Sequence, residues 1–196
     1  MLHDPVSEAN TPLTPEEQAD LIPSLATREE LNEWERDNIL RARQWALSDR
    51  QISRSEPTNE EYIRELHARM FDQTWKWAGT YRKTDKNLGI SIVEIRERLA
   101  QLLGNAAYWL KNKTYDVDEG AIRFHHELVV IHPFPNGNGR HARLVADVVA
   151  VKYGHPVFSW GSMELTAPGE ARNDYLSALR TADKGDFTPL LKFARA

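Results

Sequence analysis

The segment HPFPNGNGRHAR, which starts at His132, carries residue types that bind and transfer phosphate groups. Gly137 and Gly139 permit φ > 0 and let the backbone come close to a ligand. A helix is expected to start at this turn, where the first backbone N–H groups lack an intrahelical partner and the helix dipole favours an anion. Arg140 and Arg143, three residues apart, share one face of that helix, and their guanidinium groups suit phosphate oxygens.

His132 stands at the end of the preceding apolar helix and can face the same pocket. A neutral imidazole there can accept the proton of an incoming hydroxyl group. We therefore predict phosphoryl or nucleotidyl transfer from a polyphosphate donor, with catalysis resting mainly on positioning and charge stabilisation. Each feature alone is more often structural, and Arg143 can simply pair with Asp147 four residues on. Their occurrence together in one short segment favours a functional site.

Helices must position these residues, because apolar side chains recur at helical spacing along most of the chain. We expect helices near 28–47, 58–73, 93–111 and 117–131, with further helices in RHARLVADVVAVKYGHP, EARNDYLSALRTAD and DFTPLLKFARA. Capping-box signals mark three helix starts, at Thr14–Glu17, Thr27–Glu30 and Asp116–Glu119. The polar stretch SDRQISRSEPTNEE is predicted to be a linker, and WAGTYRKTDKNLGISI a short hairpin or an extended flap. The predicted fold class is mostly α.

Composition narrows the function classes. The chain has 196 residues, enough for one domain with a core, and its net charge of −4 gives no general attraction to nucleic acid or anionic membranes. It has no cysteine, which excludes disulfides and thiolate metal sites and is consistent with the cytoplasm. The first residues lack the pattern of a signal peptide, and no apolar run reaches the ~18 residues of a membrane span. We expect a cytoplasmic protein with no membrane or direct nucleic-acid binding.

HPFPNGNGRHAR resembles the signature HPFx(D/E)GNGRxxR of the Fic (filamentation induced by cyclic AMP) family, and departs from it at Asn136. FDQTWKWAGTYR and YLSALRTADKGDFTPLLKF resemble the Fic core in the same order, so the resemblance covers residues 58–194. Residues 1–50 then form an N-terminal arm and helix. TREELNEWERDNI together with the signature is most similar to the Fic subgroup named mobile mystery protein B.

The resemblance implies a Fic-type helical bundle with a β-hairpin flap, acting as a protein adenylyltransferase that moves AMP from ATP to a hydroxyl side chain of a target protein. His132 falls at the position of the general base, and Arg140 and Arg143 fall at the two phosphate-binding arginines. The anion hole falls on Gly137, Asn138 and Gly139. The flap that docks the target segment by strand addition falls on Thr80, Tyr81, Arg82, Lys83, Thr84, Leu88, Gly89 and Ile90.

Asn136 replaces the acidic residue that binds Mg²⁺ in most of the family. A neutral amide oxygen is a weaker ligand, since Mg²⁺ prefers charged oxygens. Two alternatives therefore stay open: a protein phosphotransferase similar to the Doc toxins, or a nucleotide-binding module without turnover. The subgroup resemblance also implies a small antitoxin or helix-turn-helix partner.

Many relatives inhibit themselves with a helix that carries (S/T)xxxE(G/N), and this chain has no literal match. The near misses are Thr27–Glu30 and the segment TAPGEA at 166–171. The N-terminal helix can lie over the site, or a separate antitoxin can supply the glutamate; a further hypothesis is that the isolated chain is unregulated. A metal-hydrolase reading of His125 and His126 is disfavoured, because adjacent residues on a helix face about 100° apart.

Overall fold

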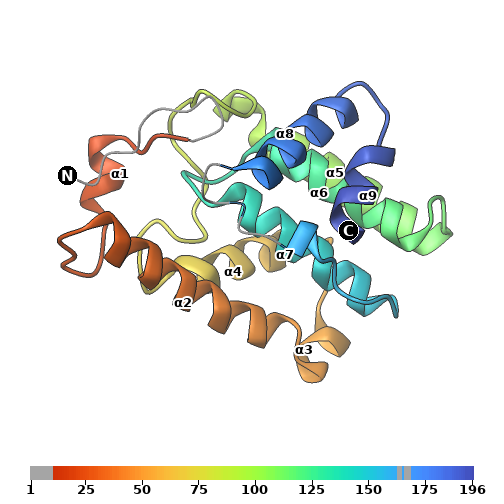
Figure 1. Ribbon diagram of the computed structural model, residues 1–196, viewed down its shortest axis with the longest axis horizontal. Helices are drawn as coiled ribbons and strands as arrows, with labels where there is room; N and C mark the ends of the chain where they lie inside the picture. The colour runs from red at the N-terminus through yellow and green to blue at the C-terminus, as the bar shows by residue number, and fades with distance from the viewer. Residues whose placement is uncertain (1–10, 163–164, 166–168) are drawn as a thin grey trace.

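The computed structural model describes residues 11–162, 165 and 169–196, and these residues are mostly helical (Figure 1). The helices are α1 (Pro15–Ala19), α2 (Arg28–Ala46), α3 (Asp49–Arg54), α4 (Glu60–Phe71), α5 (Ile95–Asn112), α6 (Val117–Ile131), α7 (Asn138–Lys152), α8 (Glu170–Ala182) and α9 (Thr188–Arg195). Short 3-10 turns occur at η1 (Ile92–Glu94) and η2 (Trp160–Ser162). The predicted mostly-α class is confirmed. None of the helices in the described ranges is long and apolar enough to cross a membrane.

Capping boxes begin the first two helices, as predicted. Thr14 Oγ1 accepts from the backbone N–H of Glu17 at 3.2 Å, and the Glu17 carboxylate accepts from the N–H of Thr14 at 2.8 Å. Thr27 and Glu30 repeat this exchange at 3.2 and 3.1 Å. Each box provides acceptors for two backbone N–H groups that have no partner within the helix. α2 then packs along α4, and the buried Asn38 hydrogen bonds across that interface (Figure 1).

The stretch that we predicted to be a polar linker contains a helix, so that prediction was wrong. α3 has weak local signals, because Ser48 at its N-cap makes no side-chain capping bond. The helix packs against α7, and Lys152 Nζ donates to the carbonyl of Ile52 at 3.4 Å. Tertiary contact overrides local preference here.

The adjacent helices α6 and α7 form the centre of the molecule, with α5 packed beside α6 (Figure 1). Asp116 caps α6 through the N–H of Asp118 at 3.2 Å, but Glu119 pairs with Arg123 instead of completing the predicted box. α6 ends where expected, at Ile131. The residue before a proline disfavours the α region, and His132 turns into the left-handed region with φ 53°.

The flap does not form the predicted β-hairpin. Residues 80–91 have irregular backbone, and among the described residues the one β pairing is an isolated bridge between Leu21 and Trp75. Hydrogen bonds from the buried guanidinium of Arg82 hold this loop in place of strand pairing. The guanidinium donates to the carbonyl of Thr84 at 3.0 Å and to the carbonyl of Ile90. The second form that we predicted, an extended flap, stays a prediction, because bends interrupt the segment.

Candidate active site

His132 is held as a neutral base with one ring nitrogen free to accept a proton. Its Nδ1 lies 3.3 Å from the carbonyl oxygen of Val129, which can only accept, so Nδ1 carries the hydrogen. Nε2 therefore has its lone pair available, and it accepts from the hydroxyl of Thr11 at 2.8 Å. Burial lowers the pKa of His132 to about 4, and the nearby Arg82 and Lys86 act in the same direction. The imidazole is thus uncharged at neutral pH.

Buried polar contacts fix the loop that follows His132. The Asn138 side chain accepts from the N–H of Phe134 and donates to its carbonyl, both at 2.9 Å. The Phe134 ring stacks on His67 with centroids 3.7 Å apart. His67 Nε2 donates to the Asn136 carbonyl at 3.1 Å, and its Nδ1 accepts from the N–H of Gly79. His67 was not among the predicted site residues, because its helical spacing resembles that of ordinary core residues in α4.

The turn that we predicted to bind phosphate leads into α7, but its two glycines act differently. Gly137 has φ 78°, and a Cβ there would lie 2.4 Å from the Phe71 ring. Gly139 lies in the first turn of α7, and its φ is not positive, contrary to our expectation. A Cβ on Gly139 would meet the Arg143 guanidinium at an ordinary 3.8 Å. The first N–H groups of α7 lack intrahelical carbonyl partners, so this end suits an anion.

Arg140 is paired with a carboxylate that our sequence analysis did not single out. Its NH1 donates to Glu35 Oε2 at 2.6 Å, while Trp75 Nε1 donates to the other oxygen at 2.7 Å. Glu35 comes from α2, so the N-terminal helix reaches a residue that we predicted to bind phosphate. Neither Glu30, which is in its capping box, nor Glu170, at the start of α8, holds this place. The rest of TAPGEA at 166–168 lies outside the described residues.

Arg143 lies on the same side of α7 but faces α8. Its guanidinium carbon is 5.4 Å from the centroid of the Tyr175 ring. The pairing with Asp147 that we considered does not occur, because Asp147 binds Arg43 at 2.5 Å and the indole N–H of Trp160 at 3.1 Å. Among the residues that the structure describes, the planar guanidinium of Arg143 is thus held by an aromatic ring and not by a carboxylate.

The position of Asn136 does not fit a metal ion. Its Oδ1 accepts from the N–H of Gly137 at 2.6 Å and from Arg140 NH2 at 3.3 Å. Its Nδ2 donates to the carbonyl of Thr11 at 3.1 Å. A neutral oxygen that already has two donors, one of them a cation, is a poor ligand for Mg²⁺. We derive no catalytic step through a metal at this residue.

The flap residues that we selected divide into an anchored set and an exposed set. Arg82 Nε donates to the carbonyl of His132 at 2.7 Å, and a Cβ on Gly89 would lie 2.5 Å from the Cβ of His132. Tyr81 donates to Glu60 at 2.9 Å. The exposed residues are Thr80, Lys83, Thr84 and, despite its contact with His132, Gly89, while Leu88 and Ile90 are half-buried. Arg82 is therefore a buried support of the loop and has no exposed guanidinium for a target segment.

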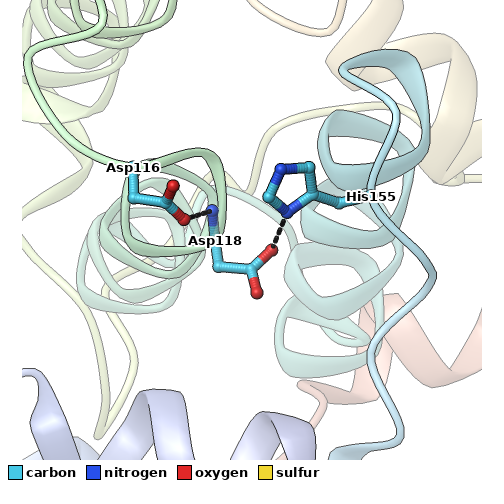
Figure 2. Close-up of side chains that lie close together, drawn as sticks. All are labelled: Asp116, Asp118 and His155. Carbon is cyan, nitrogen blue, oxygen red and sulfur yellow. Dashed lines mark hydrogen bonds and ion pairs between the residues drawn. The ribbon is translucent and has the colours of Figure 1, made fainter.

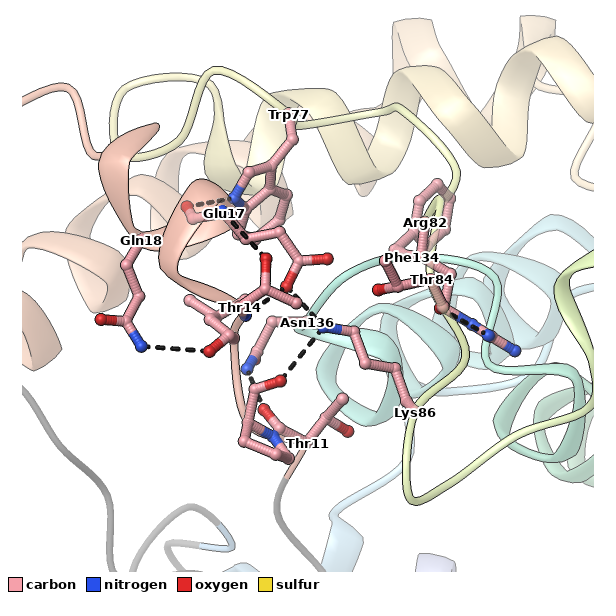
Figure 3. Close-up of polar contacts among 12 residues, drawn as sticks. Thr11, Thr14, Glu17, Gln18, Trp77, Arg82, Thr84, Lys86, Phe134 and Asn136 are labelled. Carbon is pink, nitrogen blue, oxygen red and sulfur yellow. Dashed lines mark hydrogen bonds and ion pairs between the residues drawn. The ribbon is translucent and has the colours of Figure 1, made fainter.

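The N-terminal arm lies across this loop, with Thr11 beside Asn136 (Figure 3). The hydroxyl of Thr11 reaches His132. Lys86 of the flap donates to the carbonyl of Pro12 at 3.1 Å and forms an ion pair with Glu17. The indole N–H of Trp77 donates to the carbonyl of Glu17 at 3.1 Å. The arm thus contacts the flap, a buried tryptophan and the loop after α6.

The two histidines that a metal-hydrolase hypothesis would use as ligands form hydrogen bonds with other side chains. His125 Nε2 lies 2.9 Å from the Tyr175 hydroxyl, and His126 Nε2 lies 2.8 Å from Asp183. Both are buried, which agrees with the packing role that we preferred. Trp75 and Trp77 are buried and stacked on each other, as expected for core residues and not for a platform that binds bases.

A second group of possible metal ligands lies near the start of α6 (Figure 2). Asp116, Asp118 and His155 bring their ligand atoms within 4.8 Å of one another. Arg195 already binds the carboxylate of Asp118, with Nε at 2.7 Å, and His155 donates to it at 2.9 Å. The group joins the end of α9 to the start of α6, so these contacts support a structural role.

Comparison with known proteins identifies one family. Residues 57–150 match the model of the Fic/DOC family. The "Protein adenylyltransferase Fic" of Nematostella vectensis is 30% identical over 146 residues, covering 72% of this chain and 33% of that protein. The solved Fic-1 structure from C. elegans has a TM-score of 0.62 at 27% identity, covering 91% of this chain and 51% of that one. BepC from Bartonella tribocorum, solved with AMPPNP, shares the fold, with a TM-score of 0.66, 18% identity, and coverage of 93% and 97%. The chain thus spans about a third of the length of its Nematostella relative.

Proposed function

Since the chain belongs to the Fic/DOC family, we propose that it is a protein adenylyltransferase, which transfers AMP from ATP to a hydroxyl group of a protein. One observation carries the proposal: the neutral His132 accepts a hydrogen bond from a hydroxyl group, with 2.8 Å between Nε2 and the Thr11 oxygen. His132 begins the loop that leads directly into the N-terminus of α7. A general base and an anion site therefore lie on one rigid turn, which is the arrangement that hydroxyl attack on a phosphate requires.

In this reaction the acceptor oxygen attacks the α-phosphorus of ATP. A new O–P bond forms, the bond to the β-phosphate breaks, and pyrophosphate leaves, while the hydroxyl proton passes to Nε2 of His132. The N–H groups of the first turn of α7, capped by Gly137, stabilise the charge on the phosphate oxygens. Arg140 and Arg143 bind the remaining phosphates once Arg140 is released from Glu35. Arg82, through the carbonyl of His132, keeps the base in place.

Further parts of the proposal follow from the resemblance. ATP is the donor, as the names of the adenylyltransferase relatives support. Mg²⁺ bound with the nucleotide would neutralise part of the phosphate charge, and Asn136 would give it no charged ligand. The flap receives the target segment, residues 58–194 form the catalytic domain, and residues 1–50 form an N-terminal extension, of which residues 1–10 lie outside the described residues. Thr11 and Glu35 of this extension contact the site residues, which supports a covering role. A cytoplasmic location, the mobile mystery protein B subgroup and a small antitoxin or helix-turn-helix partner belong to the same proposal.

The test is intact-mass analysis of the protein and of an added bacterial lysate after incubation with ATP and Mg²⁺, beside His132→Ala. We expect AMP to be added by the wild type and not by the variant, while calorimetry gives similar affinities of both proteins for an ATP analogue. The addition of phosphate in place of AMP would support the phosphotransferase alternative. Nucleotide binding without any transfer would support the silent module.

A further inference from the structure

The hydroxyl group that donates to His132 comes from a residue of this same chain, Thr11. Thr11 Oγ1 is 2.8 Å from Nε2, and since Nδ1 carries the ring hydrogen, the hydroxyl must donate. A target hydroxyl needs this same hydrogen bond before it transfers its proton to the base. Thr11 thus occupies the place of an acceptor substrate in the ground state.

The backbone at Thr11 and at the next residue is fixed in the same way that a docked peptide would be. The amide of Asn136 donates to the Thr11 carbonyl at 3.1 Å, and Lys86 of the flap donates to the Pro12 carbonyl at 3.1 Å (Figure 3). The two contacts use main-chain carbonyls, so they hold the segment irrespective of its side chains and leave the threonine side chain to face His132.

Stronger anchors follow a few residues along the chain. Thr14 and Glu17 close the capping box of α1, and Glu17 forms an ion pair with Lys86. Beyond α1, the N–H of Lys76 donates to the carbonyl of Asp20 at 3.0 Å, and the N–H of Ile22 donates to the carbonyl of Thr74 at 2.9 Å. These contacts restrict the position of Thr11, and such restriction makes an intramolecular step far faster than the same reaction between separate molecules.

We propose that Thr11 is a self-modification site: the chain transfers AMP from ATP to Thr11 Oγ1 within the same molecule. This inference rests on the proposed adenylyltransferase activity. The Thr11 oxygen forms a bond to the α-phosphorus, pyrophosphate leaves, and the threonine proton moves to His132 Nε2. The product has a phosphodiester in place of the hydroxyl, so it can no longer donate to His132. Modification therefore removes the hydrogen bond that holds the arm on the base.

The experiment is peptide mapping by mass spectrometry after the full chain is incubated with ATP and Mg²⁺. We expect AMP on Thr11 in the wild type, its retention in Thr11→Ser, and its loss in Thr11→Val, which keeps the shape of the side chain but lacks the hydroxyl. Thr114→Ala is the matched control, because Thr114 is exposed and lies outside the arm, and it should be modified like the wild type. A rate constant independent of protein concentration is expected for transfer within one molecule.

Two results would overturn this inference and separate it from the proposed function. AMP on other residues or on lysate proteins, with Thr11 unmodified, would leave the adenylyltransferase activity standing and assign the arm a blocking role only. Modification of a His132→Ala chain at Thr11 by added wild-type protein, at the rate seen for the wild type alone, would show transfer between molecules. The absence of AMP from every protein, in wild type and His132→Ala alike, would refute both the inference and the proposed function.

Discussion

Replacing Glu35 by glutamine tests whether α2 restrains Arg140, the arginine that we propose binds phosphate. The carboxylate holds Arg140 at 2.6 Å, and a nucleotide that uses Arg140 must first break this pair. Glutamine keeps the size of the side chain and an oxygen that can accept from the Trp75 indole, now at 2.7 Å. It removes the charge that competes with phosphate. We therefore expect Glu35→Gln to bind ATP more tightly than the wild type.

The size of the effect follows from the burial of the pair. Exposed ion pairs contribute about 0.2–1 kcal/mol, and hydrogen bonds to charged groups about 1.5–3 kcal/mol. The side chains of Arg140 and Glu35 are 22% and 12% exposed, which places this pair between the two classes. A value of about 1–2 kcal/mol corresponds to a decrease of about 5–30-fold in the Kd of ATP.

The assay is isothermal titration calorimetry with a nonhydrolysable ATP analogue at one fixed salt concentration. Glu33→Gln is the matched control, because it removes the same charge from an exposed position of α2, and it should leave the Kd close to that of the wild type. An unchanged or weaker affinity in Glu35→Gln, with a normal thermal unfolding midpoint, would refute the reasoning. An equal gain in both variants would indicate a general charge effect.

The other predictions concern the turn and the buried histidines. Gly137→Ala should lower the free energy of unfolding by about 2–4 kcal/mol in urea titrations, because it combines a positive φ with a Cβ 2.4 Å from Phe71. Gly139→Ala should fold as well as the wild type or better, yet bind the ATP analogue more weakly, since its methyl group lies at the anion site. Burial lowers the pKa values of His132 and His141 from 6.5 to about 4. Between these two pH values the unfolded chain therefore binds more protons than the folded chain. Stability to urea should therefore decrease from about pH 6.5 toward pH 4, and a constant midpoint over that range would contradict this account.

Local signals in the sequence predicted the frame of the site correctly. The end of α6 at Ile131 follows from Pro133, and the start of α7 follows from Gly137. Proline restricts the backbone dihedral angles at its position, and glycine widens their allowed range. The capping boxes at Thr14 and Thr27 involve residues only three apart. The same local reading failed at residues 80–91, where Arg82 holds main-chain carbonyls in place of a hairpin.

Only the tertiary structure decided which groups meet at the site. Glu35 and Arg140 are 105 residues apart in the chain, and Thr11 and His132 are 121 apart. Helical spacing predicts that the two arginines share a face, and the helix end at His132 predicts that the histidine can face the same pocket. Neither signal carries information about which distant side chain fills that pocket. That depends on how α2 packs on α4 and where the arm crosses the flap. The sequence by itself therefore determined the chemistry of the turn and its two helices, while the packing of the N-terminal segment determined what covers them.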